Sequence, residues 1–239
     1  MKLLLFILIQ VFANIIQAIT GFAGGPLAMP PSMALVGVIP AKSSLSLIFL
    51  VSTGVVAFQN RRHINPKKLG TMLFFMAFGF LPGLWLFAHM EATMIMIIYG
   101  IVVTLIGIWK LWRPQVSGNG SRWGYLALIL SGITQGMFTS GGPFAVIYAS
   151  SAMKDKDEFR ATLSAVWAIL NLYMVIDMYF RGMYPPYNIK LGMVSILPVF
   201  AAIWIGNRIN KKLDAAAFMK LVFILLIVSG ILLIINALR

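Results

Sequence analysis

The stretch TGFAGGPLAMP, residues 20–30, places two glycines and a proline inside an apolar part of the chain, and FTSGGPFAV, residues 138–146, repeats the arrangement. Glycine and proline destabilise a helix interior by about 1 and about 3 kcal/mol relative to alanine. In a membrane such a break leaves backbone groups unpaired, which is tolerated only where protein or water covers them. The two breaks are therefore either loop ends inside the protein or places where something polar binds.

The composition around these breaks is that of a membrane protein. Of the 239 residues, 60% are hydrophobic and 10% are charged, whereas soluble domains carry about 25% charged residues. Apolar runs long enough to span a bilayer, roughly 17–25 residues each, follow one another along the chain. The expected fold class is an all-α polytopic membrane protein. The chain has no cysteine, which excludes disulfides and thiolate metal sites.

The net charge of +13 is spread over short loops between the apolar runs. No basic helix stands free to bind phosphates, so nucleic acid is not an expected partner. Thirteen of the nineteen lysines and arginines fall in four loops, which the positive-inside rule places in the cytoplasm. The four loops lie at 61–68, 110–122, 154–160 and 208–212. On this topology Lys42 falls on the outer side.

The chain contains a weak internal duplication. Gly-Gly-Pro at 24–26 recurs at 141–143, and further matches follow in the same order at an offset that rises from 117 to 123 positions. We predict two repeats, residues 1–112 and 123–239, joined by a cytoplasmic linker at 113–122. Each contains five apolar segments, and an odd number of crossings inverts the second repeat, as in many secondary transporters. The segments are 3–21, 26–39, 43–60, 69–88, 92–112, 123–138, 143–153, 160–180, 190–206 and 215–237.

The second segment of each repeat is too short to cross the membrane. With about 11–14 residues at 1.5 Å each, it falls short of ~30 Å of hydrocarbon, which predicts a half-helix or a re-entrant helix. Proline suits a first helical turn, and the free N–H groups there attract anions. The predicted substrate-binding residues at the two breaks are Gly24, Gly25, Pro26, Ser140, Gly141, Gly142 and Pro143. The alternative is that these glycines only allow close helix packing.

The third segment of each repeat adds polar residues at matching positions. Lys42, Ser46 and Thr53 are spaced i, i+4 and i+11, and Arg160, Ser164 and Asn171 repeat that spacing. Such spacing forms one helical stripe, which would offer donors to an anion or, equally, interhelical hydrogen bonds. Other polar residues near the breaks are candidates of the same kind: Gln17, Thr20, Gln135 and Thr139.

The sequence offers little for catalysis. Asp177 lies inside an apolar run and is either a proton carrier or, as we favour, the ion-pair partner of Arg181 one turn later. Clustered acids, histidines at metal-ligand spacing and a nucleophile beside a base are all missing, and so is a phosphate-binding G-x-x-x-x-G-K-[ST] loop. We therefore expect neither an enzyme nor an ATP-driven pump, and we expect no metal and no cofactor.

Two longer stretches carry a family resemblance. TGFAGGPLAMPPSMALVGVIPAKSSLS, residues 20–46, and TSGGPFAVIYASSAMKDKDEFRATLSAVWAILNL, residues 139–172, resemble the glycine-rich signatures of the sulfite exporter TauE/SafE family of bacterial membrane proteins. Ala23 and Pro26 depart from the first signature, which is usually richer in glycine. The resemblance covers essentially the whole chain.

This resemblance implies multi-pass transport across the bacterial inner membrane. The implied substrate is a small anion such as sulfite, a sulfonate or a related organic anion, and the implied positions are the two Gly-Gly-Pro segments and the helices of Lys42 and Arg160. Together with the broken helices, it predicts a secondary transporter working by alternating access at a midplane site. A passive anion channel is the alternative, followed by a membrane enzyme, and the sequence leaves homo-oligomerisation open.

Overall fold

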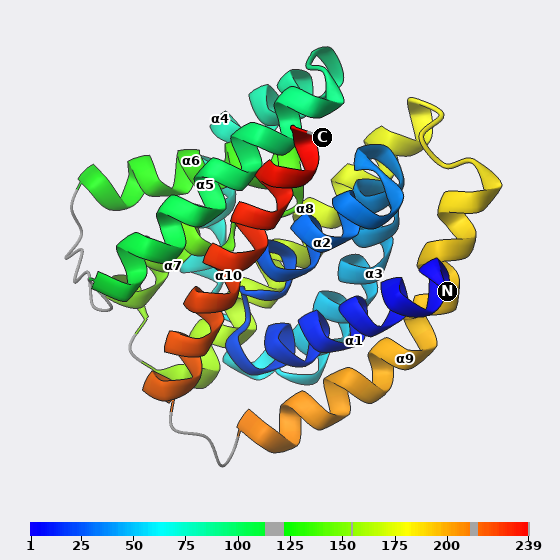
Figure 1. The fold of residues 1–239 in the computed structure, drawn as a ribbon. Helices are drawn as coiled ribbons and strands as arrows, with labels where there is room; N and C mark the ends of the chain where they lie inside the picture. The colour runs from blue at the N-terminus through cyan, green and yellow to red at the C-terminus, as the bar shows by residue number, and fades with distance from the viewer. Residues whose placement is uncertain (113–121, 154, 211–214, 239) are drawn as a thin grey trace.

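A computed structural model describes residues 1–112, 122–153, 155–210 and 215–238, and within them it contains ten α-helices, one short 3₁₀ helix and no strand (Figure 1). The predicted linker at 113–122 lies outside this part of the chain except for Arg122. The helices are α1 Lys2–Thr20, α2 Gly24–Val36, α3 Val38–Gln59, α4 Pro66–His89, α5 Ala92–Trp112, α6 Arg122–Phe138, α7 Gly142–Ala152, α8 Lys156–Phe180, α9 Pro186–Asn210 and α10 Ala215–Ala237.

Six of these helices are long and apolar enough to cross a membrane, by length and composition: α1, α3, α4, α5, α8 and α9. Large apolar side chains such as Phe74, Trp85 and Leu197 point out of the bundle, where lipid would surround them. The chain is therefore an all-α polytopic membrane protein, as its composition predicts. The ten helices also correspond one to one with the ten predicted segments.

The largest difference from the predicted boundaries is at the start of α3. This helix begins at Val38 rather than at 43, because Gly37 turns the chain with φ 91° and Pro40 fits the first helical turn. Lys42 consequently lies within the helix and is buried, with 1% of its surface exposed. The predicted start of this segment at 43, which left Lys42 outside the helix, was wrong.

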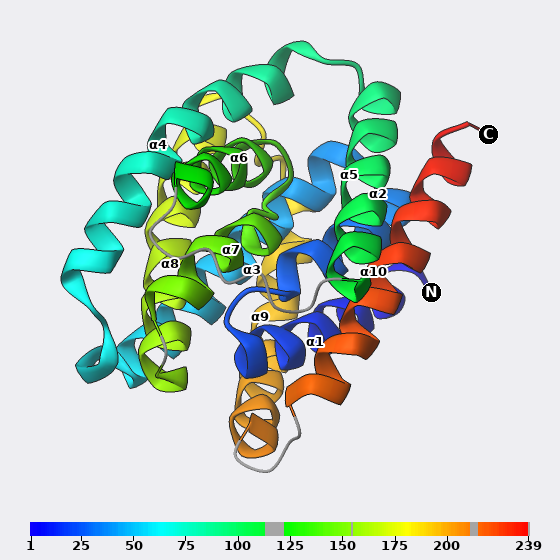
Figure 2. The ribbon, with the colours of Figure 1, turned by 90° about the vertical axis from the view of Figure 1, so that its left-hand side faces the viewer.

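Helices of the two predicted repeats pack in matching pairs. α1 lies beside α9, α4 beside α6, and α5 beside α10, while α3 crosses α8 (Figures 1 and 2). If α1–α5 correspond to α6–α10, then the pair α1 and α9 is the counterpart of the pair α6 and α4. The same correspondence exchanges α5 with α10 and α3 with α8, so each of these two pairs maps onto itself. Two repeats related by a two-fold axis would pack in this way, and the division into two repeats stays a prediction.

Individual glycine contacts follow the same rule. A Cβ added at Gly107 would meet the carbonyl oxygen of Phe223 at 3.0 Å, and one added at Gly230 would meet that of Gly100 at 2.7 Å. Gly107 and Gly230 are 123 positions apart, and so are Gly100 and Phe223. One contact thus occurs twice with the roles of α5 and α10 exchanged, and glycine is needed in both because the helix backbones approach so closely.

Candidate substrate-binding site

The two chain breaks are buried and lie directly against each other. A Cβ added at Gly25 would collide with the carbonyl oxygen of Thr139, and one added at Gly142 would collide with that of Phe22. Gly25 and Gly142 are 117 positions apart, as are Phe22 and Thr139. The glycines of each Gly-Gly-Pro motif therefore allow the backbone of the opposite break to pack against the start of the short helix. A larger side chain at Gly25 or Gly142 would force the two breaks apart.

Local backbone conformation explains where each break occurs. Gly21 ends α1 with φ 82° in the left-handed region, which glycine adopts without strain. Thr20 Oγ1 then accepts hydrogen bonds from the Phe22 and Ala23 N–H groups at 3.3 and 3.1 Å. In the second break the left-handed residue is Thr139, with φ 55°, which costs of order 1 kcal/mol in a non-glycine residue. Strained backbone of this kind concentrates at functional sites.

A glutamine holds each break in place. Gln17 Oε1 accepts from Gly24 N–H at 2.9 Å, and its counterpart Gln135 Oε1 accepts from Gly141 N–H at 3.0 Å. Gln135 Nε2 also donates to Asn171 Oδ1 at 3.2 Å. These bonds pair one N–H at the start of each short helix. Of the residues that follow, Pro26 and Pro143 have no N–H, and the Leu27 and Ala145 N–H groups donate to the Ala23 and Gly141 carbonyls at 3.3 and 3.2 Å. The Gly25 and Gly142 N–H groups, which lie in the first turns, are therefore the nearest backbone donors left for a ligand.

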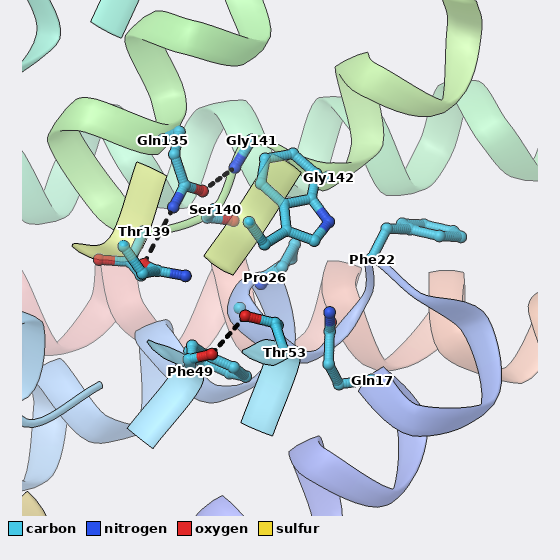
Figure 3. Close-up of a pocket in the computed structure, with 13 residues that line it drawn as sticks. Gln17, Phe22, Pro26, Phe49, Thr53, Gln135, Thr139, Ser140, Gly141 and Gly142 are labelled. Carbon is cyan, nitrogen blue, oxygen red and sulfur yellow. Dashed lines mark hydrogen bonds between the residues drawn. The ribbon is translucent and has the colours of Figure 1, made fainter. Parts of the chain in front are cut away.

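A small cavity lies between the breaks, and residues of both chain halves face each other across it (Figure 3). It has a volume of about 10 Å³, which is room for at most about one water molecule. The side chains therefore pack closely around this point. The cavity is lined by Gln17, Phe22, Gly25, Pro26, Phe49, Thr53, Gln135, Thr139, Ser140, Gly141, Gly142, Trp167 and Asn171.

Hydrogen-bond donors, rather than charges, give this cavity its chemistry. Ser140 Oγ is buried without a hydrogen-bond partner among the described residues. The Tyr99 hydroxyl is close enough to interact with it but not in hydrogen-bonding geometry. Because the Asn171 Oδ1 atom is occupied by Gln135, its amide Nδ2 remains as a donor. Together with the positive ends of α2 and α7, these groups suit a small anion.

Comparison with known proteins also indicates a membrane transporter family. The sulfite exporter TauE/SafE family matches residues 6–233. The chain belongs to this family. A curated relative in Comamonas testosteroni, "Probable inner membrane transporter protein TsaS", is 25% identical over 176 residues, which are 72% of this chain and 73% of the relative. No solved structure matches. This TauE/SafE protein is thus a multi-pass inner membrane protein of a transporter family.

The cavity of this TauE/SafE protein gathers about half of the residues that the sequence proposed. The predicted residues that line it are Gly25, Pro26, Thr53, Ser140, Gly141, Gly142 and Asn171. Gly24 and Pro143 are buried beside it in the two motifs. Gln17, Gln135 and Thr139, the further candidates near the breaks, also line it.

The two predicted cations and their neighbouring serines are not among the lining residues. Lys42 Nζ donates to the Gly136 carbonyl at 2.6 Å and sits 3.3 Å from the centre of the Phe87 ring. Ser46 Oγ donates to the Lys42 carbonyl at 2.8 Å. Arg160 donates to Asn207 and faces a different pocket, and Ser164 is buried.

Three aromatic residues that line the cavity were not proposed from the sequence: Phe22, Phe49 and Trp167. Trp167 Nε1 donates to the Gly21 carbonyl at 2.9 Å, which ties α8 to the first break. Phe49 and Trp167 are 118 positions apart, the offset that relates Thr53 to Asn171. That shared offset could have identified Phe49 and Trp167 as candidate lining residues. Their aromatic character alone could not, because aromatic residues are common in any core.

Asp177 lies away from this cavity and pairs with Arg181. The Arg181 Nε and Asp177 Oδ2 atoms are 2.8 Å apart near the end of α8, which is the ion pair that the sequence favoured. Within the described ranges no group of three His, Asp or Glu side chains gathers to hold a metal.

Proposed function

We propose that this TauE/SafE protein is a secondary transporter of a small anion, such as sulfite, a sulfonate or a related organic anion, which binds in the cavity between the breaks. The observation that carries the proposal is the buried, unpaired Ser140 hydroxyl in a cavity formed by the starts of two short helices. An unpaired polar group of this kind costs about 1–3 kcal/mol, and a hydrogen-bonding ligand would remove that cost.

The proposal includes two inverted repeats, residues 1–112 and 123–239, as its mechanical basis. The reciprocal contacts of Gly25 with Thr139 and of Gly142 with Phe22 support it. Because both repeats contribute equivalent residues to the cavity, a rocking of one against the other would open it first to one side and then to the other. The closed cavity corresponds to an occluded stage of that cycle.

A passive channel fits the geometry less well. The aromatic rings of Phe22, Phe49 and Trp167 line a cavity that admits little more than one water molecule, so no open ion path passes through it. Unitary currents of channel size in planar bilayers would contradict alternating access. An enzyme is disfavoured because the lining residues include no acid, histidine or lysine to act as a general acid or base.

Counterflow of radiolabelled sulfite into proteoliposomes tests the proposal. We expect saturable exchange, with competition from sulfoacetate, taurine, thiosulfate, sulfate or acetate defining the substrate class. Ser140→Ala should raise the half-saturating concentration by about tenfold, since it removes a hydrogen bond to a charged group. Ser52→Ala is the matched control, because Ser52 Oγ is also buried and unpaired but is not among the cavity's lining residues.

The proposal fails if no anion in this panel exchanges while the protein remains folded. It also fails in its assignment of the site if the Ser140→Ala and Ser52→Ala proteins behave alike.

A further inference from the structure

A second, wider pocket opens between the end of α3 with the loop that follows it, the start of α8 and the end of α9. It has a volume of about 550 Å³. Its lining includes His63 from the 61–68 loop, Lys156, Asp157 and Arg160 at the start of α8, and Asn207 at the end of α9. We call this pocket the vestibule. The breadth of the vestibule contrasts with the closed central cavity, so water and solutes reach it in this conformation.

Arg160 is the unusual group in the vestibule. Its side chain is buried, with 7% of the residue exposed, and its Nε–H has no hydrogen-bond partner among the described residues. One terminal nitrogen donates to Asn207 Oδ1, and Asn207 Nδ2 in turn donates to Gln59 Oε1 at 3.2 Å. Amides therefore position the guanidinium, and none of the described ion pairs involves it. A guanidinium has five donors, so a buried one held in this way has capacity left for a ligand.

The charges around Arg160 are mixed. Lys156 and His63 add positive potential or donors, whereas Asp157 opposes an anion and is exposed at the pocket. With His63 counted as neutral, these lining side chains sum to a single positive charge. The dipole at the start of α8 is already offset by Asp155, which caps the helix, and by Asp157 and Glu158 in its first turn. The balance favours a compact oxyanion that binds through the fork of Arg160.

The vestibule also adjoins the central cavity through shared elements. A Cβ added at Gly21 would lie 3.3 Å from Arg160 Cα, so α8 packs on the first break at this point. Trp167, two turns along α8 from Arg160, bonds to the same Gly21 carbonyl and lines the cavity. Gly21 and the two turns of α8 from Arg160 to Trp167 therefore connect the vestibule to the cavity.

We infer that the vestibule is an oxyanion-binding site in its own right, with Arg160 as its principal donor, from which the anion passes to the central cavity or to which it returns. Its role in transport rests on the proposed function, but binding at Arg160 does not require transport. The phosphate of an anionic lipid headgroup has the same chemistry as a free oxyanion, so the test separates these two sources.

The test uses the absence of cysteine from the chain. A His63→Cys protein carries one thiol at the vestibule, and its rate of maleimide labelling is measured in phosphatidylcholine nanodiscs against sulfate, with ionic strength held constant by gluconate. Saturating sulfate should slow labelling several-fold. In this background Arg160→Gln should raise the half-protecting sulfate concentration at least about tenfold, whereas Asp157→Asn should lower it about threefold.

Lys67→Gln is the matched control, since it removes one exposed positive charge from the same loop region without touching the vestibule lining. It should leave protection unchanged. Equal protection in the Arg160→Gln and parent proteins, or no protection by sulfate, overturns the inference. If the Arg160→Gln protein does not fold, the opposite shift expected of Asp157→Asn decides the matter, and its absence counts against the site.

Two further measurements are needed. One distinguishes a lipid headgroup from a free oxyanion as the ligand, and the other separates the vestibule site from the proposed transport function. Nanodiscs with one third phosphatidylglycerol that slow labelling without sulfate, in a manner lost in Arg160→Gln, would assign the site to a lipid headgroup. Ser140→Ala should leave vestibule protection intact while impairing counterflow. Protection without any anion exchange would retain the vestibule and reject the proposed function, whereas exchange without protection would do the reverse.

Discussion

Asp177 and Arg181 show how position decides the worth of an ion pair. Arg181 is well exposed and Asp177 partly exposed, and the pair lies at the last turn of α8 rather than beside the cavity. Exposed pairs of this kind contribute about 0–1 kcal/mol. A carboxylate that is already paired, and that lies away from the cavity, is poorly placed to carry protons with the substrate.

We therefore expect Asp177→Asn to leave the pH dependence of anion exchange unchanged and to lower the free energy of unfolding by less than about 1 kcal/mol. Counterflow measured across a range of pH checks the first point, and detergent-based unfolding checks the second. Arg181→Gln is the companion variant, because it breaks the same pair from the other side. A shifted pH profile in the Asp177 variant alone would make Asp177 a proton carrier after all.

Lys42 poses the opposite case, a buried amine without a carboxylate partner in hydrogen-bonding reach among the described residues. Its Nζ atom donates to the Gly136 carbonyl and lies over the face of the Phe87 ring. Burial of an amine without an opposite charge costs free energy, and an apolar side chain of similar size removes that cost. We expect Lys42→Met to match or exceed the parent in thermal stability. The rate of anion exchange by the Lys42→Met protein should fall. If the variant instead loses thermal stability and keeps its rate of exchange, Lys42 has a structural role only.

At the scale of the element, the glycines of the two breaks are what allows α2 and α7 to meet. Gly25→Ala and Gly142→Ala should each destabilise the fold by about 1–3 kcal/mol, because the added methyl collides with backbone of the opposite break. Gly54→Ala is the control, since a Cβ there meets no atom within 4 Å and alanine favours its helix by about 1 kcal/mol. Thermal unfolding of the three purified variants measures the difference, and equal midpoints would show that the breaks have room to separate.

Element positions followed from the sequence because length and hydropathy determine them. Runs of apolar residues and the two Gly-Gly-Pro breaks located ten helices, with most ends within four residues. The start of α3 was missed since the turn depends on Gly37 at φ 91°, and glycine alone does not reveal which φ it adopts. A hydropathy profile has no feature that separates a short turn between two apolar helices from continuous helix.

The candidate site was predicted only in part, for a geometric reason. Residues spaced i, i+4 and i+11 do lie on one face of a helix, yet they differ in depth along it. Arg160 and Asn171 are about 16 Å apart along α8 at 1.5 Å per residue, so one faces the vestibule while the other lines the cavity. Helical periodicity gives the face of a residue, and only the packed structure gives its depth relative to the breaks.

On the scale of the whole molecule, inverted repeats require the connection at 61–64 and the connection at 181–185, which leads into α9, to face opposite sides of the membrane. Single cysteines at His63 and Tyr187, both exposed, can report this in a chain that has no cysteine of its own. An impermeant maleimide added to intact spheroplasts should label Tyr187→Cys and spare His63→Cys, and inverted vesicles should give the reverse. The unsubstituted protein should remain unlabelled. Labelling of both positions from one side would reject the inverted topology.

The proposed repeats also predict which residues would become accessible during transport. Lys42 and Arg160 are 118 positions apart and are counterparts in the proposed repeats, but Arg160 lines the vestibule while Lys42 is covered by Phe87. A pocket therefore opens beside Arg160 but not beside Lys42. Under the proposed alternating access, exchange of the two repeat conformations would uncover Lys42 and close over Arg160. A Phe87→Cys protein should label slowly from the outside at rest, since Phe87 is buried, and several-fold faster while an anion is exchanged. His63→Cys should label more slowly under the same conditions, because closing of the vestibule accompanies opening of the other side. Each tenfold change in the ratio of the two states corresponds to about 1.4 kcal/mol of difference in anion binding free energy between them. Faster labelling at both positions together would describe a continuous pore, and alternating access would then be wrong.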